Sequence, residues 1–434
     1  MRRVHAALAA AATAAVVAVA VCAHRPEPPL PTLRNGAGWA SSAPFAARDL
    51  GEGLLRPVAG AIWQARGRLP GTPERAAVVS RALLDLRGLT RPNGAVAAGP
   101  SDRWAYAWPR DTSFVAAAYA VTGHLDDAWR SLSFLASVQQ ADGGFEARYL
   151  LDGSGVPDDR PRQSDGAGWV LWALDQARRA SGDGPLPAAL RTVRDRATGF
   201  ILTLTDDGRA LPPVSPDYWE VPERRLTLGT AAPLAAGLEA AARTYAAEGG
   251  LTRSAEVAAA AARLRRLVVD HFGPDFERLG RSGGLDASVA MLMPPFAQQS
   301  TTAVQAWDDY PVLALRPAGG IAPGVEWKQD GVSWTPETAL VAYTAAASGR
   351  VEEAEQWLDW LADHRTAWGS LPEKVLPDGS PAGPAPLAWT AALVVLTEQE
   401  LDARGTSVKD EAAAIRAAPA APAVTEPAGS VGSG

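Results

Sequence analysis

The chain has 434 residues, of which 47% are hydrophobic and 21% are charged, and its formal net charge is −7. This length is sufficient for one large domain or two ordinary ones. Acidic and basic residues are mixed along the chain without a Lys/Arg cluster interleaved with aromatic residues, which argues against a nucleic-acid partner. The single cysteine, Cys22, lies in the N-terminal apolar stretch, and the five histidines have no metal-binding spacing. We therefore expect no disulfide and no catalytic metal in the folded part.

The N-terminal segment has the pattern of a targeting signal. Arg2 and Arg3 precede an apolar stretch over residues 6–23, interrupted only by Thr13, and a proline-rich sequence follows. This predicts a secretory signal over residues 1–23. The stretch is also close to the ~20 residues that span a bilayer, so a retained membrane anchor is the alternative. Either way we expect an exported protein, secreted or tethered to the outer face of the cell membrane.

The next segment, residues 24–50, is rich in Pro and Ala and is predicted to be a linker; residues 411–434 are predicted to be a disordered tail. Residues 51–410 are predicted to form one helical domain. Within it, Ala-, Leu- and Arg-rich segments repeat apolar residues at i, i+3, i+4 and i+7. These segments predict helices over about residues 52–67, 73–87, 112–122, 124–140, 166–181, 187–204, 228–248, 252–271, 300–315, 335–348, 351–364 and 387–404.

Short and long connections alternate along this helical pattern. Tight breaks occur at residues 122–123, 181–184, 248–250 and 348–350, whereas the other connections are longer and contain Trp, Pro, Asp and Glu. About twelve helices paired in this way predict an all-α fold with little sheet, an (α/α)6 barrel, in which the long loops share one end and carry the function. A helical solenoid, less closed, would give a similar pattern.

Four polar motifs stand just ahead of predicted helices that follow long loops. They lie at residues 104–112, 162–166, 216–220 and 369–374. Asp111 and Asp165 are well placed to cap helix N-termini, and Arg110 could form a surface ion pair. However, Trp108, Arg110 and Asp111 lie among further aromatic residues, and such a set can bind sugar hydroxyls through directional hydrogen bonds while aromatic faces stack on the ring.

Two glutamates in these motifs have contrasting neighbours. Glu220 follows Trp219 and precedes Val221-Pro222, and apolar surroundings would raise the pKa of its carboxyl so that it could donate a proton near neutral pH. Glu373 is followed by Lys374, whose ammonium would favour the ionised form that a base requires. An acid and a base of this kind are the minimum equipment for glycoside hydrolysis, although the chain contains many other acidic pairs.

The ordered set of motifs resembles that of glycoside hydrolase family 15, the glucoamylase family, which also includes glucodextranases and some trehalases. The resemblance covers roughly residues 85–405 and rests on Trp108-Pro-Arg110-Asp111-Thr112, Gln163-Ser164-Asp165-Gly166, Trp219-Glu220, and Leu371-Pro372-Glu373 followed by Pro386-Leu387-Ala388-Trp389.

The resemblance implies an (α/α)6 barrel without a cofactor that releases glucose from non-reducing ends of α-glucosides with inversion. Glu220 would be the general acid and Glu373 the base that activates water. Arg110 and Asp111 would hold the terminal glucose, with Trp108, Asp165 and Trp219 lining the same site. The two carboxyl groups should then lie about 6.5–9.5 Å apart.

Three features depart from the family pattern. Residues 24–50 cannot supply the N-terminal β-sandwich that bacterial members usually carry. Lys328 stands where an arginine is usual, and it cannot make the same bidentate contact. Lys374 follows the base where glutamine is common. The leading hypothesis is therefore a glucoamylase-type hydrolase, expected to be a monomer acting on an oligo- or polysaccharide. A trehalase-like enzyme and a non-catalytic saccharide-binding barrel are the alternatives.

Overall fold

The computed structural model describes residues 33–34, 59–101 and 103–417. The predicted targeting segment over residues 1–23 lies outside these residues, as does most of the predicted linker and of the predicted tail. Two linker residues, Leu33–Arg34, form the short strand β1. The last helix continues to Ala417, past the predicted domain end at residue 410. In the described part of the chain, no helix is both long and apolar enough to cross a membrane.

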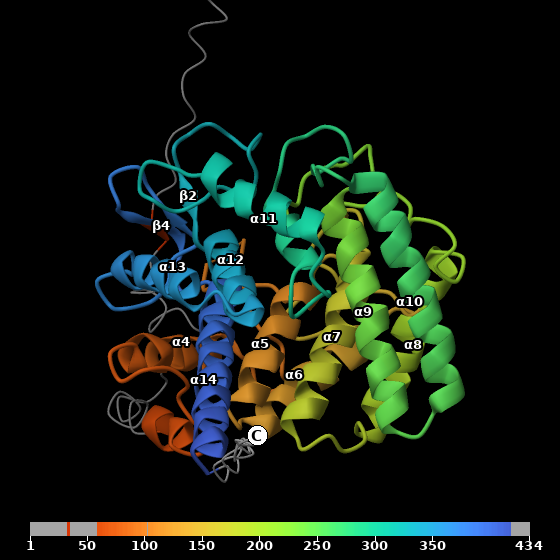
Figure 1. Cartoon of the computed structure of the whole chain (residues 1–434), viewed down its shortest axis with the longest axis horizontal. Helices are drawn as coiled ribbons and strands as arrows, with labels where there is room; N and C mark the ends of the chain where they lie inside the picture. Colours follow the sequence, from red (N-terminus) through yellow and green to blue (C-terminus); the bar gives the residue numbers. More distant parts are fainter. Residues whose placement is uncertain (1–32, 35–58, 102, 418–434) are drawn as a thin grey trace, which may run out of the picture.

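The contacts between the described helices arrange them in an inner and an outer ring. Figure 1 shows several of these helices running side by side. Each inner element packs on the next, and the last of them packs on the first, so that the ring closes. The inner elements are α5 (Pro109–Val121), α7 (Asp165–Ala180), α9 (Leu228–Ala247), the 3-10 helix η1 (Ala287–Leu292), α12 (Thr335–Ser348) and α14 (Ala388–Ala417).

The outer ring covers the inner one helix by helix. It consists of α4 (Ala76–Leu89), α6 (Leu125–Val138), α8 (Ala188–Leu204), α10 (Leu251–Phe272), α11 (Thr301–Leu313) and α13 (Val351–Asp363). The predicted (α/α)6 barrel is thus confirmed, and the predicted helices between residues 73 and 404 are found within a few residues of their expected bounds, except that the last one continues thirteen residues beyond its expected end at residue 404. The sequence pattern gave no sign of η1, because six residues are too few to show helical periodicity.

Burial explains which helix takes which position. Nearly every residue of α5 and α12 is buried, as an element surrounded by others requires, whereas α6 and α13 bury one face. Small residues allow the inner helices to approach closely. A Cβ on Gly168 of α7 would lie 2.2 Å from the Pro233 carbonyl oxygen of α9, and one on Gly237 would lie 2.5 Å from the Gly168 Cα. Only glycine fits this contact.

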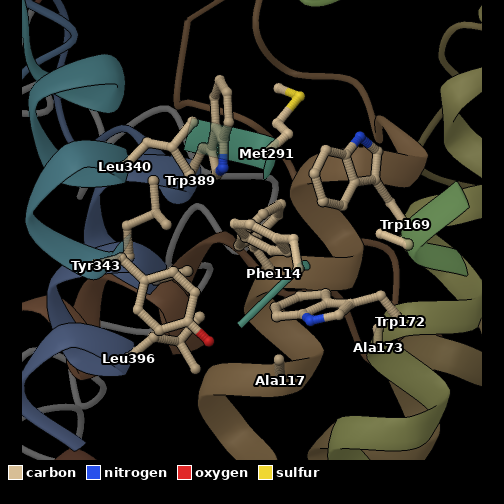
Figure 2. Close-up of a cluster of buried hydrophobic side chains, with 14 of the residues drawn as sticks. Phe114, Ala117, Trp169, Trp172, Ala173, Met291, Leu340, Tyr343, Trp389 and Leu396 are labelled. Atoms are coloured by element: carbon tan, nitrogen blue, oxygen red, sulfur yellow. The ribbon is translucent and has the colours of Figure 1, made fainter. Parts of the chain in front are cut away.

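Aromatic side chains fill the centre of the barrel. Phe114 of α5 lies among them, with its ring centroid 5.1 Å from that of Trp169, 4.7 Å from that of Trp172 and 5.8 Å from that of Trp389 (Figure 2). These rings come from α5, α7 and α14, so they join three walls of the barrel. The barrel is therefore closed by a packed core rather than open along its axis.

The long loops precede the inner elements, and most short turns link an inner helix to the outer helix that follows. The N-termini of the inner helices therefore share one end of the barrel. Four short strands lie there in the order β1-β4-β3-β2, with β2 at Ser333–Trp334, β3 at Lys374–Val375 and β4 at Pro381–Pro384. The antiparallel pairing of Trp334 with Lys374 fastens the start of α12 to the segment that contains Glu373.

Candidate active site

All four polar motifs lie in the long loops at this end of the barrel. Trp108 is the N-cap residue of α5, and Arg110 and Asp111 lie in the first turn of that helix. Asp165 is the first residue of α7, and Ser164 is its N-cap residue. Neither aspartate is thus an N-cap residue, so the prediction that Asp111 and Asp165 cap these helices is wrong.

Glu220 lies in a tight turn of the loop ahead of α9. Its φ of +56° is unusual for a residue other than glycine, and its backbone N–H donates to the Asp217 carbonyl oxygen at 2.9 Å. Its carboxylate oxygens lie 2.5 Å from Arg160 Nη1 and 3.9 Å from Arg110 Nη2. Burial raises the pKa of Glu220, although both guanidinium groups oppose the shift. The side chain is 25% exposed, so the carboxyl remains accessible.

Glu373 has a different environment. It is 8% exposed, and its Oε1 accepts a hydrogen bond of 3.0 Å from Trp104 Nε1. Its Oε2 lies 2.8 Å from Lys374 Nζ, so the ammonium expected beside this carboxyl is present. A Cβ on Gly383 would lie 2.8 Å from the same oxygen, and that glycine has a φ of +73°. The carboxyl is therefore held from several sides.

Arg110 and Asp111 are near both glutamates. Arg110 Nη2 forms an ion pair of 2.9 Å with Asp111, and its guanidinium stacks over the Trp389 ring at 4.6 Å. Asp111 interacts electrostatically with both Glu220 and Glu373, which brings the two carboxyl groups to the same region of the molecule. Burial raises the pKa of Asp111, and Arg110 opposes that shift. Arg110 Nε and Nη1 are buried without a hydrogen-bond partner in the described structure.

Asp165 lies within electrostatic reach of the same groups. Trp169 Nε1 donates to its Oδ2 at 3.0 Å, while its Oδ1 is buried without a partner. Burial raises the pKa of Asp165 to about 7, with Arg110 opposing and Glu220 adding to the shift. This carboxyl therefore titrates near neutrality in the absence of a ligand.

The aromatic and basic candidates surround these groups. Trp108 is buried, with Arg148 stacked over its ring at 5.1 Å. Trp219 is half-buried and packs edge-on against Trp327, with 4.6 Å between ring centroids. Lys328 is exposed, and its Nζ lies 5.4 Å from the Trp327 ring. It thus lies at the rim, beyond the buried groups.

Sequence reasoning missed several charged groups of this region. Arg278 is 3% exposed and forms ion pairs with Asp217 at 2.8 Å, Asp286 at 2.7 Å and Glu223 at 2.6 Å. Its guanidinium also stacks over the Trp219 ring at 3.8 Å. Asp217 in turn accepts a hydrogen bond from the Trp219 N–H at 2.9 Å, so this cluster supports the turn that contains Glu220.

Three further residues were missed for different reasons. Trp104 stood inside a motif without an assigned role, and Arg160 lies two residues ahead of another motif. Glu337 follows Pro336 at the start of a predicted helix, which is ordinary for an acid on sequence alone. Among the described residues, no group of three or more His, Cys, Asp or Glu side chains is arranged to hold a metal.

Comparison with known proteins agrees with this fold. No family model matches the chain. The isomaltose glucohydrolase of Kribbella flavida is 28% identical over 351 residues, which cover 70% of this chain and 87% of that protein. An uncharacterized glycosyl hydrolase of Methanocaldococcus jannaschii is 32% identical over 108 residues, but these cover only 24% of this chain and 17% of that protein.

Solved structures with the same fold are glycosidases. A glycosidase variant in complex with glucose has a TM-score of 0.66 at 23% identity, over 76% of this chain and 98% of the other. A bacterial glucoamylase complexed with acarbose has a TM-score of 0.61 at 16% identity; the match covers 75% of this chain and 55% of the other. The glucoamylase of Saccharomycopsis fibuligera has a TM-score of 0.58 at 14% identity; the match covers 82% of this chain and 96% of the other.

These comparisons define the class: the chain has the (α/α)6 fold of the glucoamylase-like glycosidases. The resemblance to the glucoamylase family that the motifs predicted is confirmed, and the isomaltose glucohydrolase is a curated relative that matches most of the chain.

Proposed function

We propose that the chain is an inverting α-glucosidase of glucoamylase type, which releases glucose from the non-reducing ends of α-glucosides. The observation that carries this proposal is the pair Glu220 and Glu373, two carboxyl groups in contrasting environments that both interact electrostatically with the Arg110–Asp111 ion pair's carboxylate. Glucosides of the kind named in the isomaltose glucohydrolase are the first substrates to examine.

The reaction needs one proton donor and one proton acceptor. Glu220 in its protonated form gives its proton to the glycosidic oxygen as the bond to the anomeric carbon breaks. Glu373 as a carboxylate takes a proton from a water molecule, whose oxygen forms the new bond to that carbon from the opposite face. The α-glucoside is thereby converted to β-glucose and the freed alcohol. A separation of about 6.5–9.5 Å between the two carboxyl groups leaves room for the water.

The neighbouring groups are suited to holding the terminal sugar. Arg110 and Asp111 offer charged hydrogen-bonding groups that sugar hydroxyls can reach only at this end of the barrel. Trp108, Asp165 and Trp219 complete the lining of that subsite in this proposal. Lys328, being exposed at the rim, is placed to contact the leaving part of a longer substrate rather than the terminal glucose.

One contact favours a second candidate, a saccharide-binding barrel without turnover. The ion pair between Arg160 and Glu220 stabilises the carboxylate, which is the form that cannot act as an acid. In the catalytic proposal, substrate binding excludes water and separates this pair. In the binding-only alternative, the pair persists and Glu220 stays ionised.

A hydrolysis experiment distinguishes these candidates. The purified protein would be incubated with maltose, isomaltose, dextran, starch and trehalose, and the anomer of the released sugar followed by NMR. We expect β-glucose as the first product from at least one α-linked substrate. First release of α-glucose from dextran or starch, whose leaving group is a polymer, would rule out inversion. Saccharide binding without hydrolysis would favour the second candidate. Hydrolysis of trehalose alone would indicate the trehalase-like activity.

We also propose that residues 1–23 direct export of the protein to the outside of the cell, either as a cleaved signal or as a retained anchor. Cell fractionation with N-terminal sequencing of the mature protein tests this. Recovery of the full-length chain in the cytoplasm would contradict it.

A further inference from the structure

Glu337 is a buried carboxyl group that the proposed reaction leaves without a role. It is 3% exposed and is the third residue of α12. Its Oε2 is buried and has no hydrogen-bond partner in the described part of the chain. Burying a carboxyl oxygen without a partner destabilises a fold, so this position needs an explanation.

The position of Glu337 follows from the way α12 begins. The Thr335 N–H donates to the Glu373 carbonyl oxygen at 3.0 Å, and β2 pairs with β3 through Trp334 and Lys374. The first turn of α12 is therefore tied to the backbone of the proposed base. Glu337 interacts electrostatically with Glu373, Arg110 and Lys374, three groups of the candidate site.

The ordinary structural role of an acid at this helix position is not fulfilled. In a capping box, the third residue accepts a hydrogen bond from the N–H of the N-cap residue. Here the N-cap residue is Trp334, and its N–H donates instead to the Ile321 carbonyl oxygen at 2.8 Å. The Glu337 carboxyl interacts with its own backbone N–H in the first turn of α12, while its Oε2 is left without a partner.

Several nearby donors also have other partners. Lys374 is paired with Glu373 at 2.8 Å, and Arg110 is paired with Asp111 at 2.9 Å. The hydroxyl of Tyr310, which interacts electrostatically with Glu337, donates to the Ala322 carbonyl oxygen. Burial raises the pKa of Glu337 to about 8; the hydrogen bond from its own backbone N–H opposes this shift, Glu373 adds to it, and Arg110 and Lys374 oppose it. The carboxyl is thus protonated at neutral pH and can both donate and accept a hydrogen bond.

We propose that Glu337 is a substrate-binding residue, which hydrogen-bonds one hydroxyl group of the terminal sugar beside Glu373. The unpaired buried atoms of this region include Glu337 Oε2, Arg110 Nη1 and Trp389 Nε1. A ligand rich in hydroxyl groups is the class of molecule that would satisfy donors and acceptors of this kind together. This inference rests on the proposed function, because it assigns a further contact in the same sugar subsite.

Replacing Glu337 by leucine tests the proposal through binding. Glu337→Leu removes the hydrogen bond at nearly constant size, and we expect glucose affinity, measured by calorimetry, to fall roughly ten-fold or more. Because Oε2 has no partner in the fold, the melting temperature should stay the same or rise. A matched control is Glu398→Gln, since Glu398 is equally buried but lies on α14 near Arg75 and Asp402. That variant should bind glucose like the wild type.

A series of deoxyglucoses identifies the contact. The affinity ratio of wild type to Glu337→Leu should fall to about one for the sugar that lacks the bonded hydroxyl and stay near ten for the others. If Glu337→Leu does not fold, the same series is measured with Glu337→Met, which keeps a similar length and has no hydrogen-bonding group comparable to the carboxyl. Normal glucose affinity in the variant, or an equal ratio for every sugar, would overturn the proposal. A wild-type chain that binds none of these sugars would overturn the proposed function as well.

Discussion

Two clusters of buried charge at the loop end of the barrel differ in how completely they are paired. Around Arg278, three carboxylates lie within 2.8 Å of the guanidinium, and an indole ring covers its face. Around Arg110, one carboxylate is paired at 2.9 Å, and two guanidinium nitrogens remain buried without partners. The first cluster is complete within the protein. The second has unused hydrogen-bonding capacity, as a site prepared for a polar ligand should.

The comparison shows how buried charged residues that stabilise the fold can be distinguished from those that bind a ligand. Burial alone does not distinguish the clusters, because Arg278 is 3% exposed and Arg110 is 7% exposed. Pairing does distinguish them. A charge whose partners are all supplied by the fold stabilises the fold, whereas one left partly unpaired costs stability that a ligand can restore. The following experiments test this distinction, from the largest expected effect to the smallest.

The largest effect is expected from Glu220→Gln. An amide cannot donate an acidic proton, so kcat should fall by about two to four orders of magnitude while saccharide binding persists. Rates would be measured on the best substrate of the sugar panel and binding by calorimetry. Glu326→Gln, at an exposed position of the same end, serves as the control with normal activity. A Glu220→Gln variant with most of the wild-type rate would place the acid elsewhere.

Exchanging the two arginines for methionine tests the comparison directly. Arg278→Met leaves Asp217 and Asp286 buried without their counter-ion, and we expect the free energy of unfolding to fall by about 3–5 kcal/mol. Arg110→Met should cost much less stability and should weaken saccharide binding instead. Denaturant unfolding and calorimetric titration of both variants measure the two effects. If Arg110→Met is less stable than Arg278→Met, pairing does not distinguish the charges that stabilise the fold from those that bind a ligand.

Asp111→Ala is expected to act mainly on binding. Removing this carboxylate should weaken glucose affinity by about ten- to a hundred-fold, since a charge-assisted hydrogen bond contributes about 1.5–3 kcal/mol. The melting temperature should fall less than in Arg278→Met, because Asp111 does not cap α5 and Arg110 keeps the nearby charges of Glu220 and Asp165. A large loss of melting temperature with unchanged affinity would assign Asp111 to the support of the helix.

Arg160→Gln should shift the pH dependence of kcat/KM. Activity requires protonated Glu220 and therefore falls as the pH rises through the pKa of that carboxyl. The Arg160 charge opposes the burial effect that raises this pKa, so its removal should move the alkaline limb to higher pH, by up to about one unit. Arg162→Gln is the matched control, because Arg162 lies on the same loop and pairs with Asp142 at 2.8 Å. An unmoved limb in Arg160→Gln would show that the ion pair is absent during turnover.

The fold was predictable because its signals are local. Helical periodicity and tight breaks marked each long helix, and the alternation of short and long connections indicated the barrel. The motifs also placed Glu220, Glu373, Arg110 and Asp111 correctly at one end of it. What local patterns could not show is pairing across the chain. Arg278 is hydrogen-bonded to Asp217, which is 61 residues away in the sequence, and Trp104 is hydrogen-bonded to Glu373, which is 269 residues away.

The close contact between Gly168 of α7 and Gly237 of α9 limits which substitutions this protein can accept. Asp165 begins one of these helices, and the segment that carries Glu220 leads into the other. A Cβ added to Gly237 would lie only 2.5 Å from the Gly168 Cα, so neither glycine can gain a side chain unless these two helices move apart. Random mutagenesis aimed at new sugar preferences should therefore recover substitutions in the surrounding loops and none at Gly168 or Gly237.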